Sequence, residues 1–290
     1  MFRDEDKAWK IFAIIPVAVL LICAAFLLSN LFTTGEMIAR DVELSGGKQL
    51  TAQVETSLSP ASIESSLNSL GFTDIKVKML SGLKTTLLIE MKENVDDVAL
   101  LDAAKSVDGL NVVGDVNIRS ISPMLGELFF QQAQLAIIFA FIFMAIIVFV
   151  IFKTLVPSLA VILCAATDMV FALTMMSLLG VELSLSLLAG LLLLIGYSVD
   201  TDVLLTARLL KHEGTSVLGR IKSATRTGVT MTSTTLVALL ALYFVSGNTV
   251  LQQISMVLMA GLLIDIPATW LTNAGILRTY MARKEKRRMS

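Results

Sequence analysis

The chain consists of long apolar stretches interrupted by one long polar segment. Charged residues are absent from 11–35, 133–152 and 183–199, and the stretches 154–181 and 229–277 hold one acid each. A helix needs about 20 apolar residues to cross a hydrocarbon core about 30 Å thick. A Gly-Asn turn divides the longest stretch into two helices. The pattern therefore predicts six membrane-spanning helices, at 11–32, 131–152, 156–179, 184–207, 228–246 and 251–277.

The first apolar stretch has two interpretations. Small residues at 23–25 would suit the cleavage site of a signal peptide. The apolar run is longer than the roughly 7 to 15 residues of such a peptide, and three acids, Asp4, Glu5 and Asp6, precede it. We therefore expect a retained helix, with a cleaved signal peptide as the alternative.

The polar segment between the first two spans has the pattern of a soluble α+β domain. Alternating apolar and polar positions predict strands at 49–56, 75–80, 85–91 and 111–119. Helices are predicted at 60–70, capped by Ser59 with Pro60 in the first turn, and at 95–106. This β-α-β-β-α-β order predicts a ferredoxin-like domain. The fold class is thus an α-helical multi-pass membrane protein with an inserted α+β domain.

Three domains follow from this pattern. We expect 1–35 to hold the N-terminus and the first span, and 36–127 to form the ferredoxin-like domain. The remainder, 128–290, holds five spans with a basic loop and a basic tail.

Basic residues predict the orientation in the membrane. Of the Lys and Arg residues, 15 lie in the N-terminus, in the connections after the second and fourth spans, and in the tail, all on one side of a six-span arrangement. The short turns on the other side, around Glu182 and Asn248, have none. Because cytoplasmic loops carry the excess of Lys and Arg, both termini are expected in the cytoplasm and 36–127 outside a plasma membrane. The basic tail favours contact with anionic membrane lipid, with docking to a ribosome or another acidic partner as the alternative.

Composition narrows the possible functions. The 290 residues include 23 basic and 24 acidic side chains, so no overall basic excess supports nucleic-acid binding. Cys23 and Cys164 lie in apolar spans, where packing is expected, and His212 has no second histidine with which to build a zinc site. No metal, no cofactor and no enzymatic activity are expected.

Four acids lie inside the predicted spans: Asp168, Asp200, Asp202 and Asp265. An unpaired carboxylate at a helix centre costs about 2.5 to 3.5 kcal/mol on insertion scales. The acids are therefore expected to face the bundle interior or a partner rather than lipid.

Helical spacing assigns the acids to faces. Ser198, Asp202 and Thr206 form one polar stripe, whereas Asp200 points to the other side of the helix with Tyr197. In the third span, Asp168 lies in a row of small residues that suits close helix contact. In the last span Asp265 is expected to share a face with Gly261, Thr269 and Thr272, and the fifth span contributes Thr230 and Thr234.

Two roles are open for these acids. A carboxyl group that is hydrogen-bonded can hold helices together, which we favour for Asp168. A desolvated carboxyl group can also load and release a proton near physiological pH, and we favour such a relay for the pair Asp200 and Asp202. For Asp265 both roles stay open.

The motifs in the fourth and fifth spans resemble a known family. Residues 196–203, Gly-Tyr-Ser-Val-Asp-Thr-Asp-Val, followed by Arg208, resemble the fourth-span signature of the SecF branch of the SecD/SecF protein-export family. The run 223–235 contains an Arg-Thr pair and a Thr-Ser-Thr-Thr motif, and it resembles the start of the family's fifth span. The turn Ser45-Gly46-Gly47 is similar to the Gly-Gly motif of the family's outer domain. The layout of spans also matches, so the resemblance covers essentially the whole chain and is closest to archaeal members.

The resemblance implies a half-sized member of the resistance-nodulation-division superfamily. Such a protein assembles with a SecD-like subunit, uses the proton or sodium gradient, and acts with the Sec translocon channel on an unfolded exported polypeptide. Arg226 matches the family's arginine near the fifth span, and Thr201 stands where the common bacterial pattern has its acid. The candidate relay therefore comprises Asp202, Asp200, Asp265, Asp168 and Arg226, with Ser198, Tyr197, Thr201, Thr230 and Thr234 as supporting polar residues.

Two other functions are compatible with the sequence. One is a stand-alone small-molecule exporter of the same superfamily, which would need a homodimer to reach the usual twelve spans. The other is a structural scaffold of the translocon, in which the acids only hold helices together.

Overall fold

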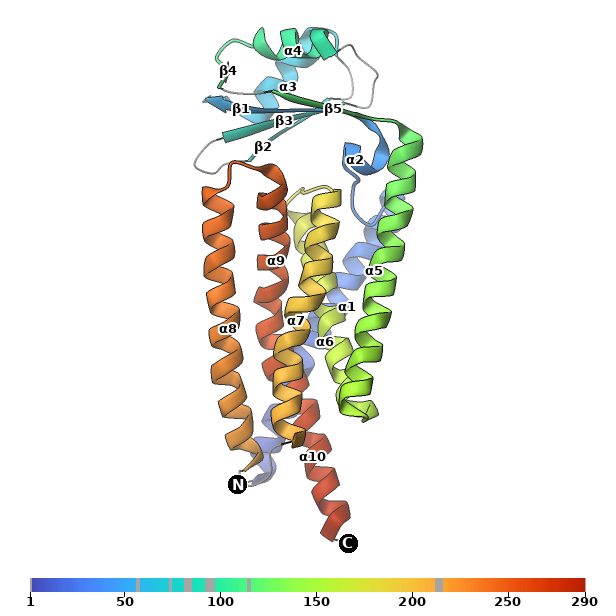
Figure 1. The fold of residues 1–290 in the computed structure, drawn as a ribbon, viewed down its shortest axis with the longest axis vertical. Helices are drawn as coiled ribbons and strands as arrows, with labels where there is room; N and C mark the ends of the chain where they lie inside the picture. The colour runs from blue at the N-terminus through green and yellow to red at the C-terminus, as the bar shows by residue number, and fades with distance from the viewer. Residues whose placement is uncertain are drawn as a thin grey trace.

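The molecule has two parts, a long helical bundle and a small sheet domain at one end of it (Figure 1). The computed structural model describes residues 2–55, 58–72, 75–80, 85–91, 97–113, 116–211 and 216–289, so His212 lies outside the described residues. Both termini lie at the end of the bundle away from the sheet (Figure 1).

Six candidate membrane spans occur in the described chain, as the hydropathy pattern predicts. They are formed by α1 (Phe2–Thr34), α5 (Pro123–Phe152), α6 (Leu155–Leu178), α7 (Leu185–Lys211), α8 (Val217–Val245) and a last span that contains α9 (Thr249–Pro267) and α10 (Ala274–Met289). Asn248 ends the turn between α8 and α9, where its side chain accepts a hydrogen bond from the Val250 amide at 2.9 Å. The predicted division of the longest apolar stretch is thereby confirmed.

The second span starts earlier than its apolar run. The helix α5 begins at Pro123, and Ser122 caps it by accepting a hydrogen bond from the Leu125 amide at 3.4 Å. Its first turns therefore extend beyond the apolar segment toward the sheet domain (Figure 1).

The last span is not a regular α-helix. Between α9 and α10 the chain forms a π-helix, Ala268–Asn273, directly after Pro267. Proline lacks the amide hydrogen that would bond four residues back, so the α-helical pattern is interrupted at this position. This wider turn lies in the middle of the bundle, next to α6 and α7 (Figure 1).

The second part of the molecule is an antiparallel sheet covered by two helices on one face (Figure 1). Its elements are α2 (Val42–Ser45), β1 (Gly47–Glu55), α3 (Pro60–Ser69), β2 (Ile75–Leu80), β3 (Thr85–Met91), α4 (Asp97–Lys105), β4 (Asn111–Val112) and β5 (Asn117–Ile121). The strands follow the order β2-β3-β1-β4, and β5 also pairs with β1. The predicted sequence of strands and helices is therefore observed, and Ser59 caps α3 as expected. The ferredoxin-like assignment itself stays a prediction.

The predicted last strand, 111–119, is divided in the structure. Val54 of β1 pairs with Val112 of β4, whereas Thr51 pairs with Asn117 of β5. The pairing register of β5 on β1 is therefore shifted by two residues relative to the register of β4 on the same strand. Alternation of side chains alone did not reveal this shift in register.

Each part has its own apolar core. In the outer domain the buried core includes Leu50, Ile63, Leu87, Ile89 and Leu100, which come from the sheet and both covering helices. A separate cluster in the bundle joins α6, α7 and α9. The two free cysteines are buried, as the packing interpretation predicts.

Candidate ion-relay site

Three acids converge in the middle of the bundle. Asp168 of α6, Asp202 of α7 and Asp265 of α9 each have 0% of their surface exposed. The row of small residues in α6 explains the approach of these helices, because Ala160, Cys164 and Ala172 are buried at the contact and let the backbones come close.

Hydroxyl groups link the acids from one side. Ser198 of α7 donates a short hydrogen bond to Oδ2 of Asp168. One turn later, the Oγ1 atom of Thr201 lies 3.0 and 3.2 Å from the two carboxylate oxygens of Asp265, and it also lies 2.9 Å from the Ser198 carbonyl oxygen. The two acids thus belong to one network.

The π-helix supplies the link to the third acid. Oγ1 of Thr269 lies 2.9 Å from Oδ1 of Asp202 and 3.0 Å from Oδ1 of Asp265. The side-chain amide of Asn273 donates to the same Asp202 oxygen at 2.7 Å. Asp202 therefore holds two contacts from the π-helix and connects α7 to the last span.

Some acceptor atoms in this network lack a partner. Among the described residues, no hydrogen bond reaches Oδ1 of Asp168, Oδ2 of Asp202 or Oδ1 of Asn273. No ion pair joins the three acids to a basic side chain in the part of the chain that the structure describes. A buried carboxylate without a counter-charge is costly. Three ionised carboxyl groups together at this position would therefore be strongly unfavourable.

The structure divides the residues predicted for the relay into two groups. Asp168, Asp202, Asp265, Ser198 and Thr201 come together in the buried network. The others lie on exposed helix faces: Asp200 and Tyr197 on α7, and Arg226, Thr230 and Thr234 on α8. Asp200 and Asp202 are thus separated by the helix, as their spacing predicts, and do not form a contact pair.

Sequence reasoning missed Asn273 and misplaced Thr272. The hydroxyl of Thr272 donates to the Ala13 carbonyl of α1 at 2.9 Å, so it faces away from the acids. The π-helix changes the rotation of the chain after Pro267, and as a result Asn273 points toward Asp202. One feature of the sequence could have indicated Asn273: it follows Thr269 by four residues, and both are polar residues in an apolar stretch.

Comparison with known proteins assigns the chain to a family. Residues 102–283 match the family described as "Protein export membrane protein SecD/SecF, C-terminal". The protein-export membrane protein SecF of Pyrococcus furiosus is 38% identical over 94% of this chain and 91% of its own length. The SecF of Methanothermobacter thermautotrophicus is also 38% identical, over 95% of this chain and 93% of its own length.

A solved structure shares the fold. The chain matches the crystal structure of SecDF, a translocon-associated membrane protein from Thermus, with a TM-score of 0.72 over 92% of this chain and 23% identity. It spans 38% of that longer SecDF chain. Together with the matched family and the two archaeal relatives, this shows that the chain belongs to the SecD/SecF family of protein-export membrane proteins.

Proposed function

We propose that this chain is a SecF-type accessory subunit of protein export, which acts with a SecD-like subunit and draws on the proton or sodium gradient. Its two termini lie in the cytoplasm and its sheet domain outside the plasma membrane. The basic residues at the end of the bundle away from the sheet support this orientation. The relatives that carry the name SecF support the export role.

The buried network of Asp168, Asp202 and Asp265 carries the proposal. A threonine hydroxyl has one hydrogen, yet Oγ1 of Thr269 lies within hydrogen-bond distance of two carboxyl groups. It can donate to one of them, and the second contact is favourable only if that carboxyl group donates a proton in return. The geometry therefore fits a network that holds at least one exchangeable proton or a cation in its place.

Such a network can convert a gradient into a change of packing. The three acids lie on three different helices, and one charge that crosses a potential of 100 mV releases about 2.3 kcal/mol. Loss of a proton would leave an uncompensated charge among the helices and would favour a different arrangement of α7 against the last span. This is the step that we assign to the relay.

The exposed acid of α7, Asp200, indicates that a partner subunit covers this helix. Asp200 lies at membrane depth on an exposed face beside Tyr197, which is 45% exposed. A Cβ added at Gly196 on the same face would meet no atom within 4 Å. Because a carboxylate facing lipid is costly, this face is expected to be covered by the SecD-like subunit. Arg226 of α8 is also exposed. The Sec translocon channel and an unfolded exported polypeptide are the further partners that we propose.

Two isosteric variants separate the relay from partner binding. Asp202→Asn keeps the shape of the side chain but cannot ionise, so it should co-purify with the SecD-like subunit and lower export in cells by tenfold or more. Asp200→Asn should leave the buried network intact and weaken co-purification. The measurements are co-purification from the native membrane and export of a secreted reporter.

Other outcomes would support other functions. Normal export in Asp202→Asn and in the double variant with Asp265→Asn would exclude the relay. Loss of the complex in Asp202→Asn, without dependence of export on the gradient, would support the scaffold. A homodimer as the only assembly in mild detergent would support the small-molecule exporter.

A further inference from the structure

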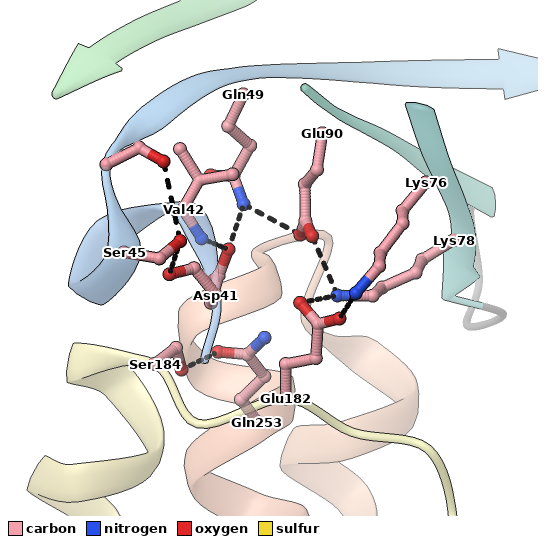
Figure 2. Close-up of polar contacts among 11 residues, drawn as sticks. Asp41, Val42, Ser45, Gln49, Lys76, Lys78, Glu90, Glu182, Ser184 and Gln253 are labelled. Carbon is pink, nitrogen blue, oxygen red and sulfur yellow. Dashed lines mark hydrogen bonds and ion pairs between the residues drawn. The ribbon is translucent and has the colours of Figure 1, made fainter. Parts of the chain in front are cut away.

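A second buried group of charged residues lies where the sheet domain meets the bundle (Figure 2). Glu182, in the turn between α6 and α7, accepts hydrogen bonds from Lys76 at 2.7 Å and from Lys78 at 2.8 Å, both on β2. Lys78 also contacts Glu90 of β3 at 2.9 Å. These residues join the β2–β3 edge of the sheet to the bundle. We use the name junction cluster for Asp41, Gln49, Lys76, Lys78, Glu90 and Glu182.

The cluster continues toward α2. The side-chain amide of Gln49 on β1 donates to Glu90 at 3.2 Å and to Asp41 at 3.4 Å. Asp41 caps α2 by accepting a hydrogen bond from the Val42 amide. Asp41, Glu90 and Glu182 are 3%, 3% and 8% exposed, so three carboxyl groups are withdrawn from solvent at this junction.

The charges of the junction cluster balance only if one carboxyl group is neutral. Three carboxylates face two lysines, Lys76 and Lys78. Burial, together with the neighbouring charge of Asp41, raises the pKa of Glu90 from 4.5 to about 8, although Lys78 opposes this shift. The hydrogen bonds from the two lysines lower the pKa of Glu182, and the nearby carboxylates raise that of Lys78. At neutral pH, Glu90 is therefore the group that carries the proton.

Other charged groups near Glu90 are fixed in separate contacts. Burial raises the pKa of Asp41 as well, so Asp41, like Glu90, binds a proton more readily in this cluster than it would in water. Glu43 of α2 pairs with Arg119 of β5 at 3.2 Å, and Arg40 pairs with Glu127 of α5 at 2.9 Å. These pairs lie on the α2 and α5 side of the domain, where the chain itself connects the two parts.

The opposite edge of the domain is attached to the bundle through close backbone contacts. A Cβ at Gly46 would lie 2.5 Å from the Pro123 backbone, and one at Gly126 would lie 2.8 Å from the Gly46 backbone, so α2 and α5 are in direct backbone contact. Gly46 also has a φ of 82°, which favours glycine. The domain is thus fixed at α2 and α5, whereas the β2–β3 edge is held to the bundle through the junction cluster.

We propose that the junction cluster is a proton-sensitive latch: the β2–β3 edge stays docked on the α6–α7 turn while Glu90 holds its proton, and swings away about the α2–α5 attachment when the proton leaves. The latch lies on the outer side of the membrane in the orientation proposed above. It therefore responds to the pH outside the cell and is distinct from the buried relay.

The sign of the effect follows from proton linkage. The docked state binds the Glu90 proton more tightly than an open state, in which the solvated side chain has its ordinary pKa of 4.5. Docking is therefore strongest near pH 4.5, and its equilibrium constant falls by up to about tenfold per pH unit as the pH rises toward about 8. At lower pH the contribution of Glu90 no longer changes, and protonation of Glu182, whose pKa is lowered in the docked state, weakens docking. Above about pH 8 the docking equilibrium no longer depends on the protonation of Glu90.

A spin-label distance measurement on the full chain in lipid nanodiscs tests the latch. Labels are placed at Asn68→Cys on α3 and Leu179→Cys after α6, both exposed positions, whereas the native Cys23 and Cys164 are buried. In the wild type, the fraction of long distances should increase between pH 5 and pH 8.5. Glu90→Gln, which is neutral at every pH, should keep the short distance throughout, and Glu90→Asp should restore the transition.

The control is Glu64→Gln on α3, outside the junction cluster, which should behave as the wild type. A pH-independent distance in the wild type would overturn the proposal. The same transition in Glu90→Gln as in the wild type would also overturn it. A short distance in Glu90→Gln at pH 5, equal to that of the wild type, shows that the variant is folded.

Discussion

At the scale of single residues, the buried network of acids depends on hydroxyl groups shared between its members. Thr269 and Thr201 each contact more acceptors than their one hydrogen can serve. This shortage makes the position of a proton in the network sensitive to each neighbouring group. One oxygen of Asp168 and one of Asp202 also lack a hydrogen-bond partner among the described residues.

A conservative variant of Thr269 tests this arrangement. Thr269→Val removes the hydroxyl between Asp202 and Asp265 and leaves buried acceptors unsatisfied, which costs about 1 to 3 kcal/mol for each. Thr272→Val is the matched control, because that hydroxyl bonds only a backbone carbonyl and its loss costs about 0.5 to 1.5 kcal/mol. Thermal unfolding in detergent should show the larger decrease for Thr269→Val. Equal decreases would contradict the shared contact.

At the scale of secondary structure, the π-helix is the element that distinguishes the last span. It directs Thr269 and Asn273 toward Asp202 and leaves Trp270 against α8. A Cβ at Gly228 of α8 would lie 2.3 Å from Cζ2 of Trp270, a rigid ring that is 7% exposed. The glycine therefore sets how closely α8 approaches Trp270 of the π-helix.

Two glycine variants measure the importance of this approach. Alanine normally stabilises a helix by about 0.8 to 1 kcal/mol relative to glycine, but overpacking costs about 1 to 3 kcal/mol. Gly228→Ala should therefore lower the unfolding temperature of the isolated chain, whereas Gly196→Ala on the exposed face of α7 should keep or raise it. An unfolding temperature that does not decrease in Gly228→Ala would show that Trp270 moves aside freely.

Hydropathy and spacing were sufficient for most elements but not for their contacts. Periodicity predicts the six spans, the strands β2 and β3, and the cap at Ser59. It also predicts that Asp202 is buried on the side of α7 opposite Asp200. The register shift between β4 and β5 and the rotation after Pro267 do not follow from it, because each one breaks the local period. Contacts between distant segments, such as Lys76 with Glu182, depend on tertiary packing that no local pattern encodes.

At the scale of the whole molecule, the outer domain is attached to the bundle in two unlike ways. The α2–α5 contact depends on backbone shape, whereas the β2–β3 edge depends on charges that respond to solution conditions. A change in charge on the bundle side should therefore alter the position of the entire domain.

The variant Glu182→Gln tests this dependence. It removes the anion that pairs with both lysines, so docking should weaken at every pH. The charge of Glu182 also contributes to the raised pKa of Glu90, so the pH transition should move to lower pH. The same spin-label pair measures both effects. Asp97→Asn, which removes a pair with Lys48 within the domain, is the control that should leave the distance unchanged.

The helix α5 is continuous, so it can transmit movements of the bundle to the sheet domain. Its 30 residues, Pro123–Phe152, extend about 45 Å at 1.5 Å per residue, from the inner end of the second span to the contact with Gly46. A tilt of about 5° around the inner end would displace the outer end by about 4 Å on this length. Because no flexible loop intervenes at Pro123, small helix movements at membrane depth would reach the outer domain with little loss of amplitude.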